Sequence, residues 1–274
     1  MSNPNITLAT SIVPDDRLKI QLVASKSWVL HGIDILSVNC FDELNKLIDK
    51  FPHVDFVGND RTGRHLTGKP VVFINDILHH LKATKSQTLG IINSDIIAHS
   101  LNNLIPKIRE LSKIGLVYGP RLDIANSKER NGVLDPFGFD FFFFHRSLLD
   151  VWKESQFCLG MPFWDHWFPL VALLENKNIA KLHCNNFCHV SHSTHRDSSF
   201  FLFNDHFVQK LIPYIKHNTV GFGTDFDFSP YSDLKSKAIN KQGSNYNQNL
   251  VKFYDKLTKY VLNFLDQNSQ IIKL

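Results

Sequence analysis

The run Thr88-Leu-Gly-Ile-Ile is apolar and stops abruptly at Asn93-Ser94-Asp95. A short aliphatic run of this kind is typical of a buried strand, and ligands of open α/β sheets gather outside the carboxyl ends of the strands. An acidic residue at that edge can hold a hard divalent cation, which in turn neutralises a diphosphate. The alternative is that Asn93 or Asp95 only caps a helix beginning near Ile96.

Strand-like and helix-like segments alternate over roughly the first 120 residues, which predicts an α/β protein with a mainly parallel sheet flanked by helices. Further along, the phenylalanine-rich segment from Gly138 to Arg146 is typical of a deeply buried strand. The expected strands are 6–13, 33–38, 54–57, one ending at Asn93, 114–118, 138–146, 179–183 and 187–190. Helices are expected over 18–29, 41–51, 101–111, 163–175 and 204–217. Another is expected to start from Pro70 and to contain Ile74, Ile77, Leu78 and Leu81, and the last contains Leu250 to Phe264.

Composition indicates an enzyme-sized globular protein, because 43% of the 274 residues are hydrophobic. No apolar stretch approaches the roughly 18 residues needed to span a bilayer. The segment Met1 to Asn5 has no basic region followed by an apolar core, so we expect a cytoplasmic protein. Cys184 and Cys188 lie close to His183, His189 and His192, which leaves a structural zinc site as an alternative, although the usual second Cys-x-x-Cys is missing.

The formal net charge of +4 indicates mild affinity for anions. The basic residues are dispersed and show neither a zinc-finger nor a recognition-helix pattern, so the sequence argues against nucleic acid as a partner. A phosphorylated small molecule or a peripheral contact with an anionic membrane surface would each account for the charge.

An ordered set of motifs extends from residue 6 to about residue 200. They are Ala9-Thr10-Ser11, a helix with Arg17, Gln21 and Ser27-Trp28, then Asn93-Ser94-Asp95, Gly138-Phe-Asp-Phe-Phe-Phe and Trp164-Asp165. This order resembles the GT-A nucleotide-sugar glycosyltransferases, in particular a group with a Trp-Asp-x-Trp helix and a His-rich segment after it. The resemblance implies a GT-A-like (Rossmann-like) catalytic domain over 1–200, with a helical C-terminal extension over 201–274 packed on it.

The resemblance implies that Thr10 and Ser11, at the end of the first strand, receive the nucleotide, and that Arg17 approaches the phosphates. Asn59 and Asp60 take the place where such enzymes contact the base or ribose. Arg64 and Lys69, together with Arg61, lie in the adjoining loop and are candidates for neutralising the diphosphate. Solvent-exposed positions without a ligand role are the alternative for these three cations.

Asn93-Ser94-Asp95 matches the family's Asp-x-Asp motif with the first acid replaced by an amide. The resemblance makes Asp95 the direct ligand of Mn²⁺ or Mg²⁺, with Asn93 and Ser94 beside the donor. Loss of one negative charge should weaken the ion's binding, so the phosphates of the nucleotide sugar would help to complete it. A late histidine supplies a further ligand in many such enzymes, and His192 is the first choice, followed by His189.

The implied reaction is a hexosyltransferase-like attack of an acceptor hydroxyl on the sugar of a nucleoside-diphosphate sugar, with the acceptor a glycan, glycolipid or polysaccharide precursor. Asp165 in Trp164-Asp165-His166-Trp167 is placed like the catalytic base, and its alternative role is helix capping. Trp164 and Trp167 offer either a sugar-binding face or core packing. Asp140, inside an apolar strand, favours a structural hydrogen-bonding role over a catalytic one.

Three other functions stay open at the level of sequence. A sugar-phosphate nucleotidyltransferase has a related fold, but its glycine-rich basic loop is not found after the first strand. A catalytically silent nucleotide- or sugar-binding module is compatible with Asn93, and a zinc-stabilised interaction protein is compatible with the cluster from Cys184 to His195.

The last amphipathic helix either packs on the core, covers the acceptor side or forms a homodimer contact.

Overall fold

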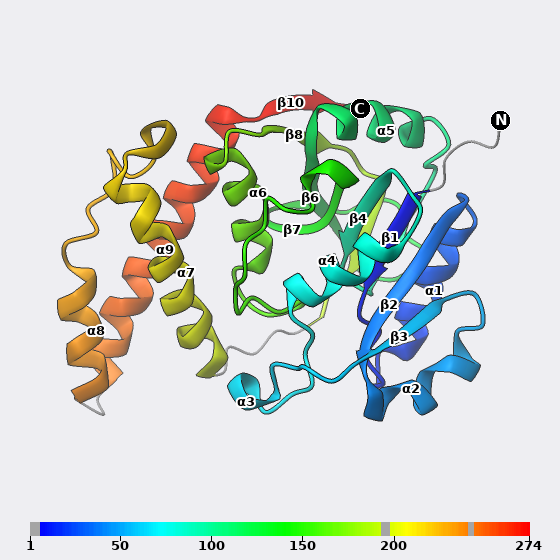
Figure 1. Ribbon diagram of the computed structural model, residues 1–274, viewed down its shortest axis with the longest axis horizontal. Coiled ribbons are helices and arrows are strands. Elements are labelled where there is room, and N and C mark those ends of the chain that lie inside the picture. The colour runs from blue at the N-terminus through cyan, green and yellow to red at the C-terminus, as the bar shows by residue number, and fades with distance from the viewer. Residues whose placement is uncertain (1–5, 193–197, 241–243) are drawn as a thin grey trace.

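A twisted sheet forms the centre of the computed structural model, which describes residues 6–192, 198–240 and 244–274 (Figure 1). Within these residues the sheet has ten strands in the order β10-β8-β6-β7-β4-β1-β2-β3, with β9 paired to β6 and β5 paired to β9. The strands are β1 (Ile6–Thr10), β2 (Ile33–Cys40), β3 (Asp55–Asn59), β4 (Thr88–Ile92), β5 (Ile96–Ala98), β6 (Gly115–Ile124), β7 (Val133–His145), β8 (Asn178–His183), β9 (Phe187–Val190) and β10 (Gln270–Lys273).

Helices cover both faces of this sheet. They are α1 (Leu18–Val29), α2 (Phe41–Leu47), α3 (Arg64–Thr67), α4 (Ile74–Ala83), α5 (Leu104–Ile114), α6 (Trp164–Leu174), α7 (Ser198–Lys216), α8 (Tyr231–Asn240) and α9 (Ser244–Asn268), with short 3-10 turns at Ile48–Lys50, Arg146–Leu148 and Thr219–Gly221. One apolar core joins the sheet to α4, α6, α7 and α9, and a second joins it to α1 and α5. The predicted α/β class with a mainly parallel sheet is confirmed.

The position of strand β7 explains why four consecutive residues of the chain, Phe141 to Phe144, are phenylalanines. Successive side chains of a strand point to opposite faces, so Phe142 and Phe144 enter the core under α6 while Phe141 and Phe143 enter the core on the other face. The ring centroid of Phe142 lies 5.1 Å from that of Trp164, and Phe141 stacks on Phe187 at 3.9 Å. A strand buried on both faces has no need for alternating polar residues.

The segment after Asp95 differs from the alternative of a helix beginning near Ile96. Residues Ile96–Ala98 form β5, antiparallel to β9. The indole of Trp28 donates to the carbonyl oxygen of Ile96 at 2.7 Å, and the amide of Ala98 donates to the Ser27 hydroxyl at 2.9 Å. These bonds from α1 satisfy backbone groups that a helix would have used internally, so helix capping is wrong as the role of Asn93 and Asp95.

Several predicted boundaries were also wrong: β6 runs to Ile124, β7 begins at Val133 and α7 begins at Ser198. The first strand ends at Thr10 instead of Val13, because the side chain of Gln21 bonds both the amide and the carbonyl of Val13 at 2.8 Å and thus replaces a neighbouring strand. The helix expected from Pro70 begins at Ile74, after the short helix α3 and an extended stretch whose backbone pairs with the segment at Cys158.

Helices α7, α8 and α9 lie together at one end of the molecule (left in Figure 1), and the chain returns from α9 to the sheet through β10. Strand β10 lies parallel to β8, and α9 contacts α6. Sequence reasoning missed β10, which has only four residues, and α8, whose residues are mostly polar. Within the described residues the structure contains no helix with the length and apolar character needed to cross a membrane.

Candidate active site

The candidate site lies at the carboxyl edge of the parallel strands. Strands β1, β2 and β4 run in the same direction, and β7 runs antiparallel to β4, so the first half of β7 reaches the edge where β4 ends. The amide of Asn93 donates to the carbonyl oxygen of Asp140 at 3.0 Å, and Ile96 closes the turn by donating to the carbonyl of Asn93 at 3.2 Å. This turn holds Asp95 at the end of β4.

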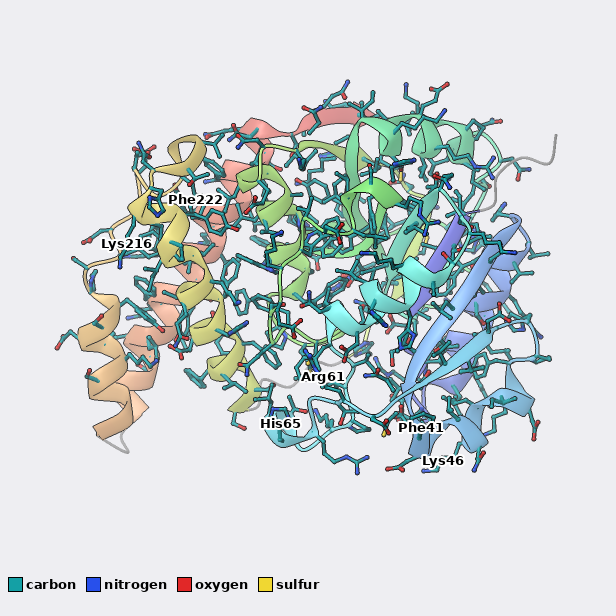
Figure 2. All side chains as sticks on the ribbon, viewed as in Figure 1. Phe41, Lys46, Arg61, His65, Lys216 and Phe222 are labelled. Carbon is teal, nitrogen blue, oxygen red and sulfur yellow. The ribbon has the colours of Figure 1, made fainter. Side chains whose placement is uncertain are left out.

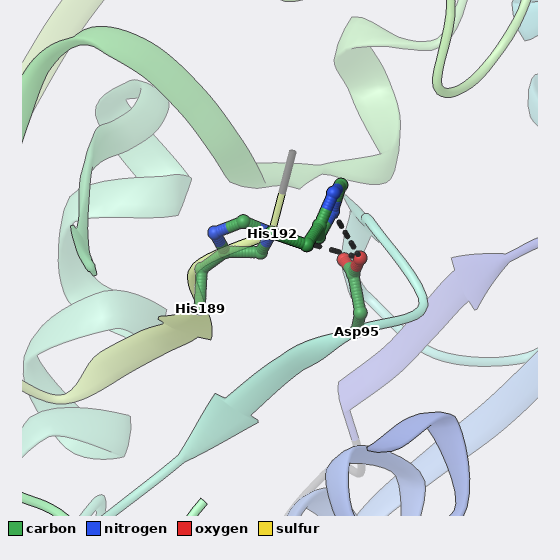
Figure 3. A group of neighbouring side chains, drawn as sticks. All are labelled: Asp95, His189 and His192. Carbon is green, nitrogen blue, oxygen red and sulfur yellow. Dashed lines mark ion pairs between the residues drawn. The ribbon is translucent and has the colours of Figure 1, made fainter. Parts of the chain in front are cut away.

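Asp95, His189 and His192 converge at this edge (Figure 3). One ligand atom from each lies within 4.8 Å of the others. The Nε2 atoms of His189 and His192 are 3.7 and 3.9 Å from Asp95 Oδ2. The histidines come from the end of β9 and the residues after it, while Asp95 immediately precedes β5, the partner of β9. The structure therefore brings together the three residues predicted as metal ligands, whereas His195 lies outside the described residues.

The ring of His189 is oriented by a second carboxylate. Its Nδ1 lies 2.9 Å from Asp123 Oδ1. Burial alone would raise the pKa of Asp123, but hydrogen bonds from His189 and Arg121 outweigh it and hold that pKa below its usual value. An ionised carboxylate only accepts hydrogen bonds, so Nδ1 of His189 donates and the lone pair of neutral His189 is on Nε2, toward Asp95. A carboxylate that orients a histidine in this way is a regular partner of metal-binding histidines.

The donor set fits a divalent transition ion. Two imidazoles and one carboxylate suit Mn²⁺ better than Mg²⁺, which prefers oxygen ligands. The guanidinium of Arg17 borders the same site, with Nη1 3.2 Å from Asp95 Oδ2 and 3.2 Å from His192 Nε2. Arg17 also pairs with Asp15, and its side chain remains 42% exposed. The guanidinium of Arg17 can therefore contact an anionic ligand that enters from solvent.

Arg121 connects Asp123, the partner of His189, to the turn after β4, and sequence reasoning did not assign it a role. Its guanidinium contacts three carboxylates: Asp123 at 2.9 Å, Asp135 at 2.9 Å and Asp140 at 2.5 Å. The other oxygen of Asp140 accepts a hydrogen bond from the side-chain amide of Asn93. Arg121 and Asp123 are two residues apart in β6, and that alternation in an otherwise apolar strand was the available signal.

Asp165 lies in the first turn of α6, with its side chain 18% exposed. Its Oδ2 accepts from the amide of Phe139 in β7 at 3.5 Å. Burial raises the pKa of the neighbouring Asp140, Arg121 lowers it, and the charges of Asp165 and Asp95 raise it further. Phe139 directly precedes Asp140 in β7, so Asp165 lies beside the strand segment whose next residue bonds the side chain of Asn93.

Thr10 and Ser11 follow β1, the strand next to β4. Thr10 is fully buried, and its hydroxyl has no hydrogen-bond partner among the described residues. Ser11 is partly exposed. The backbone just beyond them is fixed by β2, because Ile12 donates to the Ser37 hydroxyl at 3.0 Å and its carbonyl accepts from Asn39 at 2.7 Å. An unpartnered buried hydroxyl is uncommon and asks for an explanation.

Asn59, the last residue of β3, and Arg64 in α3 contact side chains that do not belong to this cluster. The Asn59 amide donates to Asp76 at 2.9 Å, and Arg64 pairs with Asp42 at 3.0 Å. Asp60 and Lys69 are exposed. Figure 2 shows Arg61 and His65 in the segment that follows β3, and the guanidinium of Arg61 lies 4.4 Å from the ring centroid of Phe73. Their role toward a nucleotide remains a prediction.

Two alternatives from the sequence are not supported. Trp164 and Trp167 are 2% and 6% exposed and pack in the core, so neither offers a face to a sugar. Burial raises the pKa of the Cys184 thiol to about 11 and also raises that of Cys188. Across the described part of the chain, these thiols join no group of three ligands compact enough for an ion. Among the residues that the structure describes, these cysteines therefore form no zinc site.

No family model and no curated protein matches the chain. Among solved structures, S. aureus TarS in complex with UDP-GlcNAc is 11% identical, covers 83% of this chain and 77% of its own, and has a TM-score of 0.47. Glucosyl-3-phosphoglycerate synthase from Mycobacterium tuberculosis, in complex with Mg²⁺ and UDP, is 15% identical over 78% of this chain and 79% of its own, with a TM-score of 0.44.

The 4-diphosphocytidyl-2C-methyl-D-erythritol synthase of Anaerococcus prevotii is 13% identical over 75% of this chain and 96% of its own, with a TM-score of 0.41. The structures similar to this chain thus include proteins in complex with UDP-GlcNAc and with UDP. At these identities and TM-scores they assign neither a family nor an activity.

Proposed function

We propose that this protein transfers a sugar from a nucleoside-diphosphate sugar to a hydroxyl acceptor, with Asp95, His189 and His192 holding a divalent cation. The observation that carries the proposal is the convergence of these three ligands at the carboxyl edge of the sheet, with His189 already oriented by Asp123. Such an edge is where open α/β sheets bind their ligands. The donor set favours Mn²⁺ over Mg²⁺.

The departing nucleoside diphosphate carries the charge that has to be stabilised. A bound divalent cation supplies that stabilisation as a Lewis acid. Arg17, partly exposed and beside Asp95, adds a positive charge that can reach a phosphate oxygen. The partly exposed Ser11 supplies a polar group at the end of the adjacent strand, directly after the buried and unpartnered hydroxyl of Thr10.

Asp165 is the proposed base that removes the proton from the acceptor hydroxyl. Its carboxylate lies in the first turn of α6, against the backbone of β7. One oxygen is oriented by the amide of Phe139, and the partial exposure of the side chain leaves it accessible to an acceptor. A base held by backbone contacts needs little reorganisation when the hydroxyl arrives.

A catalytically silent nucleotide-sugar-binding module is the second candidate, and Asn93 favours it. Its amide bonds Asp140 and contributes no negative charge toward a cation. A cation would then be held by a single carboxylate and two histidines. The two candidates make the same prediction for donor binding and opposite predictions for turnover.

The test is thermal-shift measurement with UDP-, GDP-, CMP- and dTDP-sugars, each with and without Mn²⁺. A ligand that binds only the folded state raises the apparent stability by mass action. We expect one nucleotide to raise Tm in the presence of Mn²⁺, and Asp95→Ala to abolish this shift. Asp49→Ala, at an exposed acid after α2, is the matched control and should retain it. Metal-independent shifts, or none with any nucleotide, would contradict the proposal.

A further inference from the structure

We propose that Arg121 and Asp123 are positioning residues, which aim His189 at the cation and connect it to the turn that holds Asp95. This inference deepens the proposed function, since His189 is one of the proposed ligands. It concerns contacts that are present in the protein itself: Arg121 to Asp123 at 2.9 Å, and Asp123 to His189 at 2.9 Å.

The first step is the orientation of the imidazole. His189 is buried at the end of β9, where its Nδ1 donates to Asp123 and its Nε2 faces Asp95. Histidine in water prefers to carry its proton on Nε2, which would block the nitrogen that faces Asp95. The carboxylate of Asp123 therefore selects the tautomer in which Nε2 is free to bind a metal.

The second step is the placement of Asp123 by Arg121. A carboxylate can rotate about its side-chain bonds, and both Asp123 and Arg121 lie on the same face of β6. Arg121 Nε bonds Asp123 while its two terminal nitrogens bond Asp135 and Asp140. A planar guanidinium presents donors in several fixed directions, whereas the single ammonium of lysine cannot hold three carboxylates in one geometry.

The third step connects the two halves of the cation site. One carboxylate oxygen of Asp140 accepts from Arg121, and the other accepts from the side-chain amide of Asn93. The backbone carbonyl of Asp140 accepts from the backbone amide of Asn93. The guanidinium of Arg121 on β6 thus links Asp123, which bonds His189 on β9, to Asp140 on β7, which bonds Asn93 two residues before Asp95.

The experiment measures the affinity for Mn²⁺ alone by the EPR signal of the free ion. The variants are Asp123→Ala and Arg121→Lys, and the control is Asp205→Asn, which removes the carboxylate that pairs with Lys235 at 2.7 Å in the C-terminal helices. Second partners of metal-binding histidines typically contribute about 10- to 100-fold to metal affinity. We expect losses of that size in both variants and unchanged affinity in the control. Circular dichroism establishes that each variant is folded.

A second readout needs no metal. In ¹⁵N-¹H correlation spectra of the imidazoles at alkaline pH, His189 of the unchanged protein should carry its proton on Nδ1, and Asp123→Ala should shift the proton toward Nε2. The Nε2-protonated form in the unchanged protein would overturn the inference, as would folded variants that bind Mn²⁺ like the unchanged protein. If the tautomer is as expected but the unchanged protein binds no Mn²⁺, the positioning by Asp123 is supported and the proposed function fails.

Discussion

The indole nitrogen of Trp28 donates a 2.7 Å hydrogen bond to the carbonyl oxygen of Ile96, the residue directly after Asp95. Trp28 is fully buried on α1, and Ile96 begins β5. The bond attaches the helix that follows β1 to the backbone that carries the proposed metal ligand. The position of Asp95 therefore depends on a contact between two segments that are far apart in the chain.

Trp28→Phe should lower both stability and metal affinity. The substitution leaves the buried carbonyl of Ile96 without its donor, which costs about 1 to 3 kcal/mol in the free energy of unfolding. The matched control is Trp152→Phe, because the Trp152 indole donates in the same way to the carbonyl of Phe168 at 2.9 Å. Urea unfolding should show a loss in both variants, whereas Mn²⁺ titration should show weaker binding only in Trp28→Phe. If Trp28→Phe bound Mn²⁺ as tightly as the unchanged protein, the Trp28–Ile96 contact would have no effect on the metal site.

Asp165→Asn should remove turnover and leave donor binding intact. An amide keeps the acceptor oxygen for the amide of Phe139 but cannot take up a proton, so kcat should fall roughly 10²- to 10⁴-fold. Asp233→Asn, in the first turn of α8, is the control for the loss of a charge at a helix start. The measurement is the rate at which the nucleoside diphosphate is released in the presence of a hydroxyl acceptor, which gives kcat. Full activity of Asp165→Asn would exclude this residue as the base.

Thr10→Val should separate stability from donor binding. The Thr10 hydroxyl is buried without a partner, so its replacement by a methyl group should leave stability unchanged or raise it. If the hydroxyl bonds the nucleotide, donor affinity should fall about 3- to 10-fold, the usual contribution of one hydrogen bond. In Thr7→Val the opposite is expected, because the Thr7 hydroxyl donates to Ser86 at 2.8 Å. Unchanged donor affinity in Thr10→Val would remove Thr10 from the site.

Stability should decrease between pH 6.5 and pH 4 in part because of His206. Burial lowers the pKa of His206 from 6.5 to about 4, while its neutral Nε2 accepts from the amide of Gln156 and its ring packs edge-on against Phe157. The unfolded chain binds the proton at higher pH than the folded one, so this stability is complete above pH 6.5 and is lost as the pH falls toward 4. Urea unfolding of His206→Gln should depend less on pH in that window. Identical pH profiles would refute the role of His206.

Much of the fold could be predicted from local pattern. The aliphatic run of β4 and the phenylalanines of β7 are buried whichever neighbours they meet, so their burial follows from composition. On α1 local pattern does not predict burial, since the apolar Val29 is 41% exposed while the polar Gln21 is buried. Gln21 is buried because its amide replaces a strand partner for Val13, and no local pattern reports such a bond.

By itself the sequence determined the alternation of elements, because strand ends and helix starts are readable from a few neighbouring residues. The candidates Asp95, His189, His192 and Asp165 came from the resemblance of its ordered motifs to the GT-A glycosyltransferases. Only the tertiary structure decided that Ile96 begins a strand and that Arg121 and Asp123 support the site. Those outcomes depend on the antiparallel course of β7 beside β4 and on the pairing of β5 with β9. Contacts between distant segments are set by how the layers pack, and a local pattern does not encode them.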